Sequence, residues 1–115
     1  MAKDDYYVIV CKILVYLYNR LKGRDNRDPM VFLNPTPKDF PISQSYFDYC
    51  IRHMYKKGYI EGVAVQANGD EIYGVYVTEK IQITPEGIDF MQDNSKIRRA
   101  MELLPEAAGL IASFV

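Results

Sequence analysis

The stretch that decides the fold is residues 43–60, which read SQSYFDYCIRHMYKKGYI. Ser43 is a typical N-cap, and the apolar residues after it recur at i, i+3, i+4 and i+7, which predicts an amphipathic helix from Gln44 to Lys57. Gly58 is the residue type that commonly ends such a helix. The inward stripe consists of Phe47, Cys50, Ile51 and Met54. The opposite side is polar, so we expect this helix to lie at the surface of a domain.

Two β-rich runs follow this helix and predict a hairpin. They cover residues 59–66 and 71–77 and are separated by residues 67–70, which contain Asn68-Gly69. Asn-Gly is the strongest short hairpin signal, because both central residues of a type I′ turn need positive φ. Residues 81–83 can extend the second strand.

The remaining C-terminal part is predicted to be helical. Thr84-Pro85-Glu86-Gly87 reads as a cap followed by a helix-starting proline, and this helix should end near Asn94. Residues 96–115 continue as helix with a break near Pro105, and they contain no charge after Glu106. This uncharged tail is too short to span a membrane, so we expect it to dock on protein.

Upstream of this pattern lies a helix that is apolar nearly all round. Apolar residues recur at helical spacing over residues 7–21, with Asp4 or Asp5 near the start and Gly23 just past the end. Such a helix must be buried on more than one side.

The segment between this first helix and Ile42 is rich in proline, so it cannot hold a long helix. Within it, residues 30–33 predict one short strand. Residues 36–39 begin with a threonine and a proline, which predicts one turn of helix.

Composition excludes several classes of protein. The chain has 115 residues, with 14 Lys+Arg against 15 Asp+Glu, and a net charge of -1. It offers no global attraction to nucleic acid or anionic lipid, so such binding has to come from a local patch. Cys11 and Cys50 fall on apolar stripes and His53 is the one histidine, which favours reduced core thiols in a cytoplasmic protein over a metal site. The apolar run 6–18 is interrupted by Lys12, so neither a membrane helix nor a signal peptide is expected.

The order of these elements resembles a winged helix-turn-helix domain. More narrowly, residues 55–63 (YKKGYIEGV) and 83–91 (ITPEGIDFM) resemble the YjcQ-like family of small winged-helix proteins from bacteria and their prophages. The resemblance implies an α+β fold with an N-terminal apolar helix, a β-hairpin wing and additional C-terminal helices. It implies a winged-helix domain over residues 1–94 and a C-terminal helical extension over 95–115, packing on the first helix or on a dimer mate. The proline-rich connection is longer than a compact domain of this kind needs.

Transcription regulation is what this fold implies, with double-stranded DNA as the partner. The predicted recognition helix would then enter the major groove with its N-terminal half. Residues in the first turn of this helix would contact base edges, and residues nearer its C-terminal end would contact phosphates. The predicted nucleic-acid-binding residues are Gln44, Ser45, Tyr49, Arg52, Lys56 and Lys57. Arg20, Lys22, Arg24, Arg27 and Lys38 could enlarge the basic patch.

The alternative is a winged-helix protein-interaction module that does not bind DNA. The predicted hairpin tip, Asn68 to Glu71, is acidic and would face phosphates unfavourably. Tyr73 and Tyr76 are expected to be core or half-buried. The apolar first helix and the uncharged tail predict a homodimer through these two segments, unless the tail folds over its own helix. No catalytic motif, metal-ligand spacing or cofactor loop is recognisable, so we expect neither an enzyme nor a cofactor.

Overall fold

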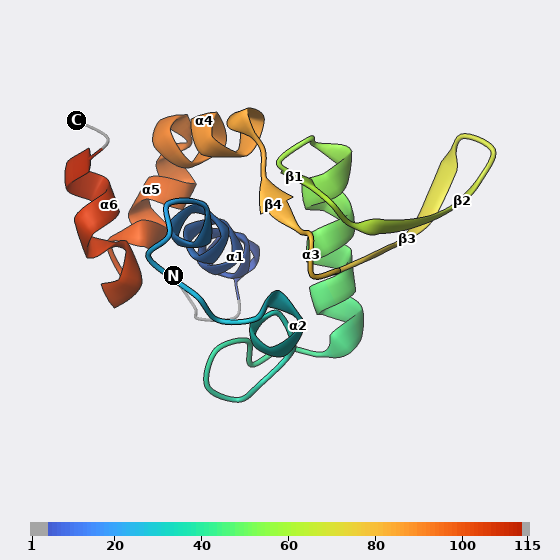
Figure 1. Cartoon of the computed structure of the whole chain (residues 1–115), viewed down its shortest axis with the longest axis horizontal. Helices are drawn as coiled ribbons and strands as arrows, with labels where there is room; N and C mark the ends of the chain where they lie inside the picture. Colours follow the sequence, from blue (N-terminus) through green and yellow to red (C-terminus); the bar gives the residue numbers. More distant parts are fainter. Residues whose placement is uncertain (1–4, 114–115) are drawn as a thin grey trace.

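Helix α1, Tyr6–Leu21, lies at the centre of the molecule with the other elements around it (Figure 1). The computed structural model describes residues 5–113. Asp5 is the N-cap and accepts a hydrogen bond from the backbone N–H of Tyr7, whereas Asp4, the other expected cap, lies outside the described residues. Nine residues of α1 are buried, because several elements cover it from different sides. The predicted burial of this helix on more than one side is confirmed.

The architecture is mixed α+β, with helices and two small antiparallel sheets of two strands each. β1 (Ile60–Glu61) pairs with β4 (Gln82–Ile83), with Ile60 opposite Ile83. β2 (Ala64–Asn68) pairs with β3 (Glu71–Tyr76), and their register shifts between Gln66 and Ala67. The elements after α1 are α2 (Pro29–Phe32), α3 (Gln44–Lys56), β1 (Ile60–Glu61), β2 (Ala64–Asn68), β3 (Glu71–Tyr76), β4 (Gln82–Ile83), α4 (Pro85–Asp93), α5 (Ser95–Met101), the 3-10 helix η1 (Pro105–Ala107) and α6 (Ala108–Ser113).

The proline-rich segment differs from the prediction in both of its parts. Residues 30–33 do not form a strand; most of them belong to the short helix α2, because Asp28 caps it and Pro29 occupies its first turn. Residues 36–39 do not form a helical turn. Instead, the backbones of Thr36 and Phe40 exchange two hydrogen bonds of 2.9 and 3.0 Å around a tight turn. Phe40 is fully buried, so its packing in the core decides the path of this segment.

The hairpin region also corrects two expectations. Residues 81–83 do not extend β3; the chain turns after β3, and β4 pairs with β1 instead. The hairpin loop is Gly69-Asp70, and Gly69 alone of the two has positive φ, as in a type II′ turn rather than the predicted type I′. Glycine accepts positive φ readily, so Gly69 takes the first position of the loop. The turn therefore lies one residue later than the predicted Asn68-Gly69.

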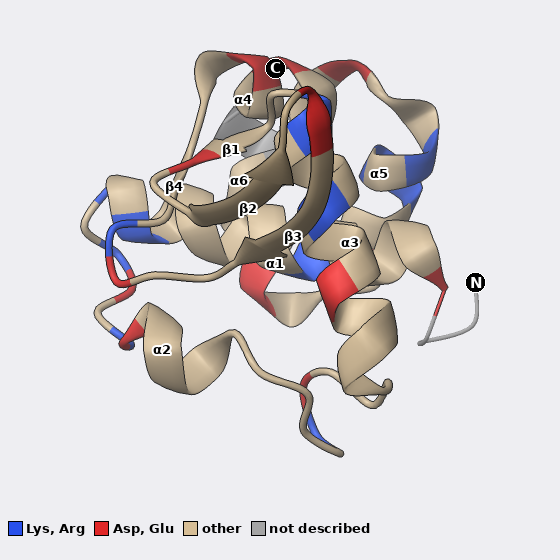
Figure 2. Cartoon of the chain, turned by 90° about the vertical axis from the view of Figure 1, so that its right-hand side faces the viewer, with Lys and Arg blue, Asp and Glu red and all other residues tan. Residues whose placement is uncertain are grey.

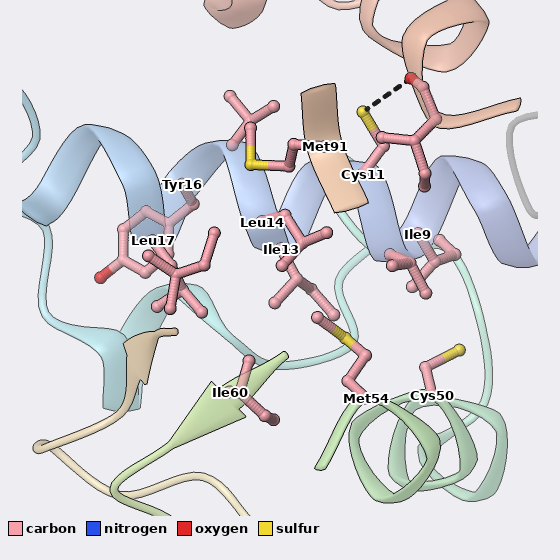
Figure 3. Packing of buried hydrophobic residues seen from close by; sticks show 14 of the residues in the cluster. Ile9, Cys11, Ile13, Leu14, Tyr16, Leu17, Cys50, Met54, Ile60 and Met91 are labelled. Carbon is pink, nitrogen blue, oxygen red and sulfur yellow. Dashed lines mark hydrogen bonds between the residues drawn. The ribbon is translucent and has the colours of Figure 1, made fainter. Parts of the chain in front are cut away.

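One cluster of buried residues runs from Val8 to Leu110, so the helices after α4 share the core with α1. Figure 3 shows part of this packing, with the Cys11 Sγ 3.8 Å from the carbonyl oxygen of Ile97 in α5. Within the expected docking tail, Leu110 is buried, but Phe114 and Val115 lie outside the described residues. Because α1 is already buried inside one chain, its apolar character no longer requires a dimer mate, and the homodimer stays a prediction.

No helix in residues 5–113 combines the length and the apolar character that crossing a membrane requires.

Candidate functional site

Helix α3 has the inner and outer faces that its sequence predicts. The hydroxyl of Ser43 accepts a hydrogen bond of 3.2 Å from the backbone N–H of Tyr46, which fixes the start of the helix. The predicted stripe of Phe47, Cys50, Ile51 and Met54 is buried. The helix is therefore anchored along one side, and its other side is held in a fixed orientation toward solvent.

The outer face of α3 brings the predicted site residues together. Gln44, Ser45, Tyr49, Lys56 and Lys57 are exposed, and Arg52 is half-buried. We call these six residues, together with His53, the α3 face.

Aromatic and cationic groups meet at the middle of the α3 face. The rings of Tyr49 and His53 are 4.3 Å apart, and the guanidinium carbon of Arg52 is 5.6 Å from the centre of the Tyr49 ring. A cation held near an aromatic ring by such weak forces keeps its hydrogen-bond donors available. Arg52 can thus turn toward a phosphate or a base edge without breaking an ion pair.

The cations of the α3 face have no carboxylate partner among residues 5–113. The one salt bridge among the described residues joins Arg27 to Asp25, in a different part of the molecule. Asp48, the single acidic residue of α3, accepts a hydrogen bond of 2.9 Å from the side-chain amide of Gln44 instead. The cations of this face are therefore not held in ion pairs within the described part of the chain.

The basic surroundings of the α3 face also affect the pKa of His53. Desolvation lowers the pKa of His53 below its usual value, and the neighbouring charges of Arg52, Lys56 and Lys57 lower it further. His53 is consequently neutral near pH 7 and can either donate or accept a hydrogen bond there. It adds no charge to the face, and no carboxylate of the described residues forms an ion pair that would orient it as a general base.

The N-terminal end of α1 extends this surface in a way that sequence reasoning missed. The Tyr6 ring lies 6.3 Å from that of Tyr49 and 5.3 Å from that of Tyr7. Lys96, at the start of α5, places its ammonium 4.8 Å from the centre of the Tyr7 ring. Three basic residues within four positions, Lys96, Arg98 and Arg99, were the available sequence signal. Of these three, Lys96 is joined to the α3 face, and only by the packing of α1 against α3 and α5.

The β2–β3 hairpin lies beside α3 and projects beyond it (Figure 1). In Figure 2 its acidic tip lies in front of the basic C-terminal end of α3, and Figure 1 shows that the hairpin projects away from the helix. Tyr73 and Tyr76 are 58% and 44% exposed, so the expectation that they would be core or half-buried is wrong. Val75 is the buried side chain of β3 instead, and Tyr73 is the extra, exposed residue at the bulge where the register of β2 and β3 shifts.

The additional basic residues expected to enlarge the patch lie elsewhere. Arg20 and Lys22 are at the C-terminal end of α1, whereas Tyr6 at its N-terminal end approaches α3. At about 1.5 Å per residue, these two ends are roughly 20 Å apart. Arg27 is paired with Asp25, and Lys38 lines a pocket on another side of α1.

The two cysteines carry no chemistry at this site. Both are unpaired and buried, as predicted. Burial raises the pKa of each thiol to about 12. Within the described part of the chain, no group of histidine, cysteine and acidic side chains is arranged to hold a metal ion.

We predict that neither thiol reacts with iodoacetamide in the folded protein at pH 8. With a pKa of about 12, the reactive thiolate is about one ten-thousandth of each cysteine at that pH, and burial blocks access. Mass spectrometry should show no adduct on the native protein and two after unfolding in guanidinium. Rapid labelling of the native protein at either position would contradict this assignment.

Fold and surface together define an α+β protein that presents a basic and aromatic helix face beside an antiparallel hairpin. A family model described as YjcQ protein matches residues 11–108, which is most of the chain. The chain therefore belongs to the YjcQ family, as the resemblance in residues 55–63 and 83–91 predicted. No curated protein and no solved structure matches it significantly.

Proposed function

We propose that this protein is a winged-helix DNA-binding protein that reads the major groove with α3 and acts in the cytoplasm as a transcriptional regulator of the prophage type. The observation that carries the proposal is the α3 face, where Arg52, Lys56 and Lys57 have no carboxylate partner among the described residues and stand on a well-anchored helix. A solvent-exposed helix of any soluble protein carries lysines, but usually beside acidic residues that offset their charge.

The arrangement around α3 supports the winged-helix assignment. The β2–β3 hairpin packs against the side of α3 and projects beyond it, as a wing does. A helix supported in this way can enter a groove about 12 Å wide. The hairpin tip carries Asp70 and Glu71, so the proposed contact is limited to α3 and the surface next to it.

Roles within the α3 face follow from position and chemistry. Gln44 uses one amide hydrogen on Asp48, which leaves its carbonyl oxygen and second amide hydrogen for the paired contact that adenine accepts. Ser45 lies in the same first turn and can meet either a base or a phosphate. Arg52 lies farther along the exposed side and is suited to guanine or phosphate. Lys56 and Lys57, at the C-terminal end, are suited to the backbone.

A salt titration with random duplex DNA tests the proposal. If Arg52, Lys56 and Lys57 each neutralise one phosphate, the logarithm of the association constant should fall with the logarithm of salt concentration with a slope of about -2.7. Fluorescence anisotropy of a labelled duplex, started at about 20 mM salt, measures this slope. Absence of association at low salt, or association that salt does not weaken, would overturn the proposal.

A second candidate is a protein-interaction module on the same fold. It is favoured by the exposed apolar and aromatic side chains of the hairpin, Val65, Tyr73 and Tyr76, next to an acidic tip. Tyrosine is enriched in protein interfaces because its ring buries area while its hydroxyl stays paired. The salt titration separates the candidates, since a module of this kind gives no salt-dependent association with DNA.

A further inference from the structure

A pocket of about 240 Å³ lies on the part of α1 not covered by α3. Its walls come from α1, from the loop and short helix that follow it, and from the turn at η1. No residue of the α3 face lines it, so a ligand proposed for this pocket does not rest on the proposed DNA binding. The apolar lining consists of Val15, Tyr16, Phe32, Leu104 and Pro105.

The aromatic wall of this pocket is held in place by several contacts. The Tyr16 and Phe32 rings are 4.5 Å apart between centres, and the Tyr16 hydroxyl donates a hydrogen bond of 2.5 Å to the carbonyl oxygen of Arg27. The guanidinium of Arg27 lies 3.9 Å from the centre of the Phe32 ring and is paired with Asp25. The wall is thus formed before any ligand arrives, which lowers the entropic cost of binding.

Unpaired charges of both signs surround this apolar wall. The ammonium of Lys12 is half-buried and donates one hydrogen bond of 2.7 Å to the backbone carbonyl of Asp39, but no described carboxylate pairs with it. Two of its three donors are therefore left over. Asp39, Glu106 and Lys38 also line the pocket, and the described residues offer their charged side chains no ion pair.

We propose that this pocket binds a small zwitterion, an amino acid with an apolar and preferably aromatic side chain. Lys12 would bind its carboxylate, Glu106 and Asp39 its ammonium, and Tyr16 and Phe32 its side chain. The unpaired lining charges, two positive and two negative, balance, so a zwitterion binds without leaving a net charge in a half-buried site. A cavity of about 150 Å³ holds benzene, so 240 Å³ holds one ring and a short charged arm.

Calorimetric titration with L-phenylalanine is the first test. We expect saturable binding of L-phenylalanine, and binding at least about tenfold weaker for 3-phenylpropionate, which lacks the ammonium, and for phenethylamine, which lacks the carboxylate. Each missing group forfeits one charge-assisted hydrogen bond. No binding of L-phenylalanine up to about 10 mM, or equal binding of either truncated analogue, would overturn the proposal.

Two variants assign the charges to residues. Lys12→Met keeps the apolar stem of the side chain and should weaken L-phenylalanine binding at least about tenfold, whereas Lys22→Met, near the end of the same helix but outside the pocket, should not change it. Asp39→Asn combined with Glu106→Gln should weaken L-phenylalanine but not 3-phenylpropionate. Thermal denaturation shows whether each variant folds. If Lys12→Met does not fold, the combined variant still tests the proposal. A folded variant that binds as tightly as the parent chain would contradict the assignment.

Discussion

Replacing Arg52 and Lys56 together by alanine is expected to weaken binding to random duplex DNA by roughly ten- to a hundredfold at about 0.1 M salt. Both residues lie on the outer side of α3, and neither pairs with a described carboxylate. Removing one phosphate contact lowers the salt slope by about 0.9, so the slope should fall by about 1.8 in this double variant. Anisotropy titrations at several salt concentrations measure both the affinity and the slope.

The double variant Lys22→Ala with Arg24→Ala is the matched control. It also removes two positive charges, but from the opposite end of α1 and the loop that follows it. An effect of net charge alone would weaken DNA binding equally in both variants. An effect of the α3 face would appear in the first variant alone. Equal losses, or no loss in the first variant, would count against α3 as the DNA-reading element.

Loss of binding in the first variant should not come from unfolding. Lys56 is exposed, and Arg52 approaches the ring of Tyr49, which is itself exposed. Such a contact at an exposed site contributes about 0.5–1 kcal/mol. Alanine also favours helix formation, so the free energy of unfolding should change little. Circular dichroism during heating checks this.

Replacing Gly62 by alanine is expected to lower the free energy of unfolding by about 2–5 kcal/mol. Gly62 has a φ of 72°, where a side chain costs about 1–2 kcal/mol. A Cβ there would also lie 2.1 Å from the backbone carbonyl oxygen of Lys80, so the chain before β4 must move. Such overpacking costs about 1–3 kcal/mol more. Unfolding in urea, followed by circular dichroism, measures the change.

Gly58→Ala separates the two contributions. Gly58 has a φ of 81°, but a Cβ added to it meets no atom within 4 Å. This variant should therefore lose about 1–2 kcal/mol, the backbone contribution alone. The difference between the two losses in the free energy of unfolding measures the energetic cost of adding a Cβ where Gly62 lies close to Lys80. Equal losses would show that this approach is not tight in solution.

The local elements were predictable because their signals lie within a few residues of each other. Ser43 caps α3 and Thr84 caps α4, as their positions before an apolar helical pattern indicated. Asp28 and Pro29 carried an equally local signal for α2. The apolar content of residues 30–33 favours a strand, but a cap and a helix-starting proline outweigh that propensity where the segment pairs with no strand of the described residues.

The candidate site was predictable in its helix but not in its surroundings. Spacing along α3 places Ser45, Tyr49 and Arg52 on one face, whatever the rest of the chain does. Tyr6 and Lys96 join that face through contacts between residues more than forty positions apart, which no local pattern encodes. The pocket beside α1 is likewise built from segments far apart in the sequence.

Sequence alone therefore determined α3 and α4 with their caps, the inward stripe of α3, the presence of a hairpin and the cations of the α3 face. These depend on hydrogen bonds and spacing within one or two turns of chain. Tertiary structure decided that β4 pairs with β1, that Tyr73 and Tyr76 face solvent, and that α1 is covered by its own chain. The reason is that pairing and burial depend on which distant surfaces fit together, and an apolar residue carries no information about its partner.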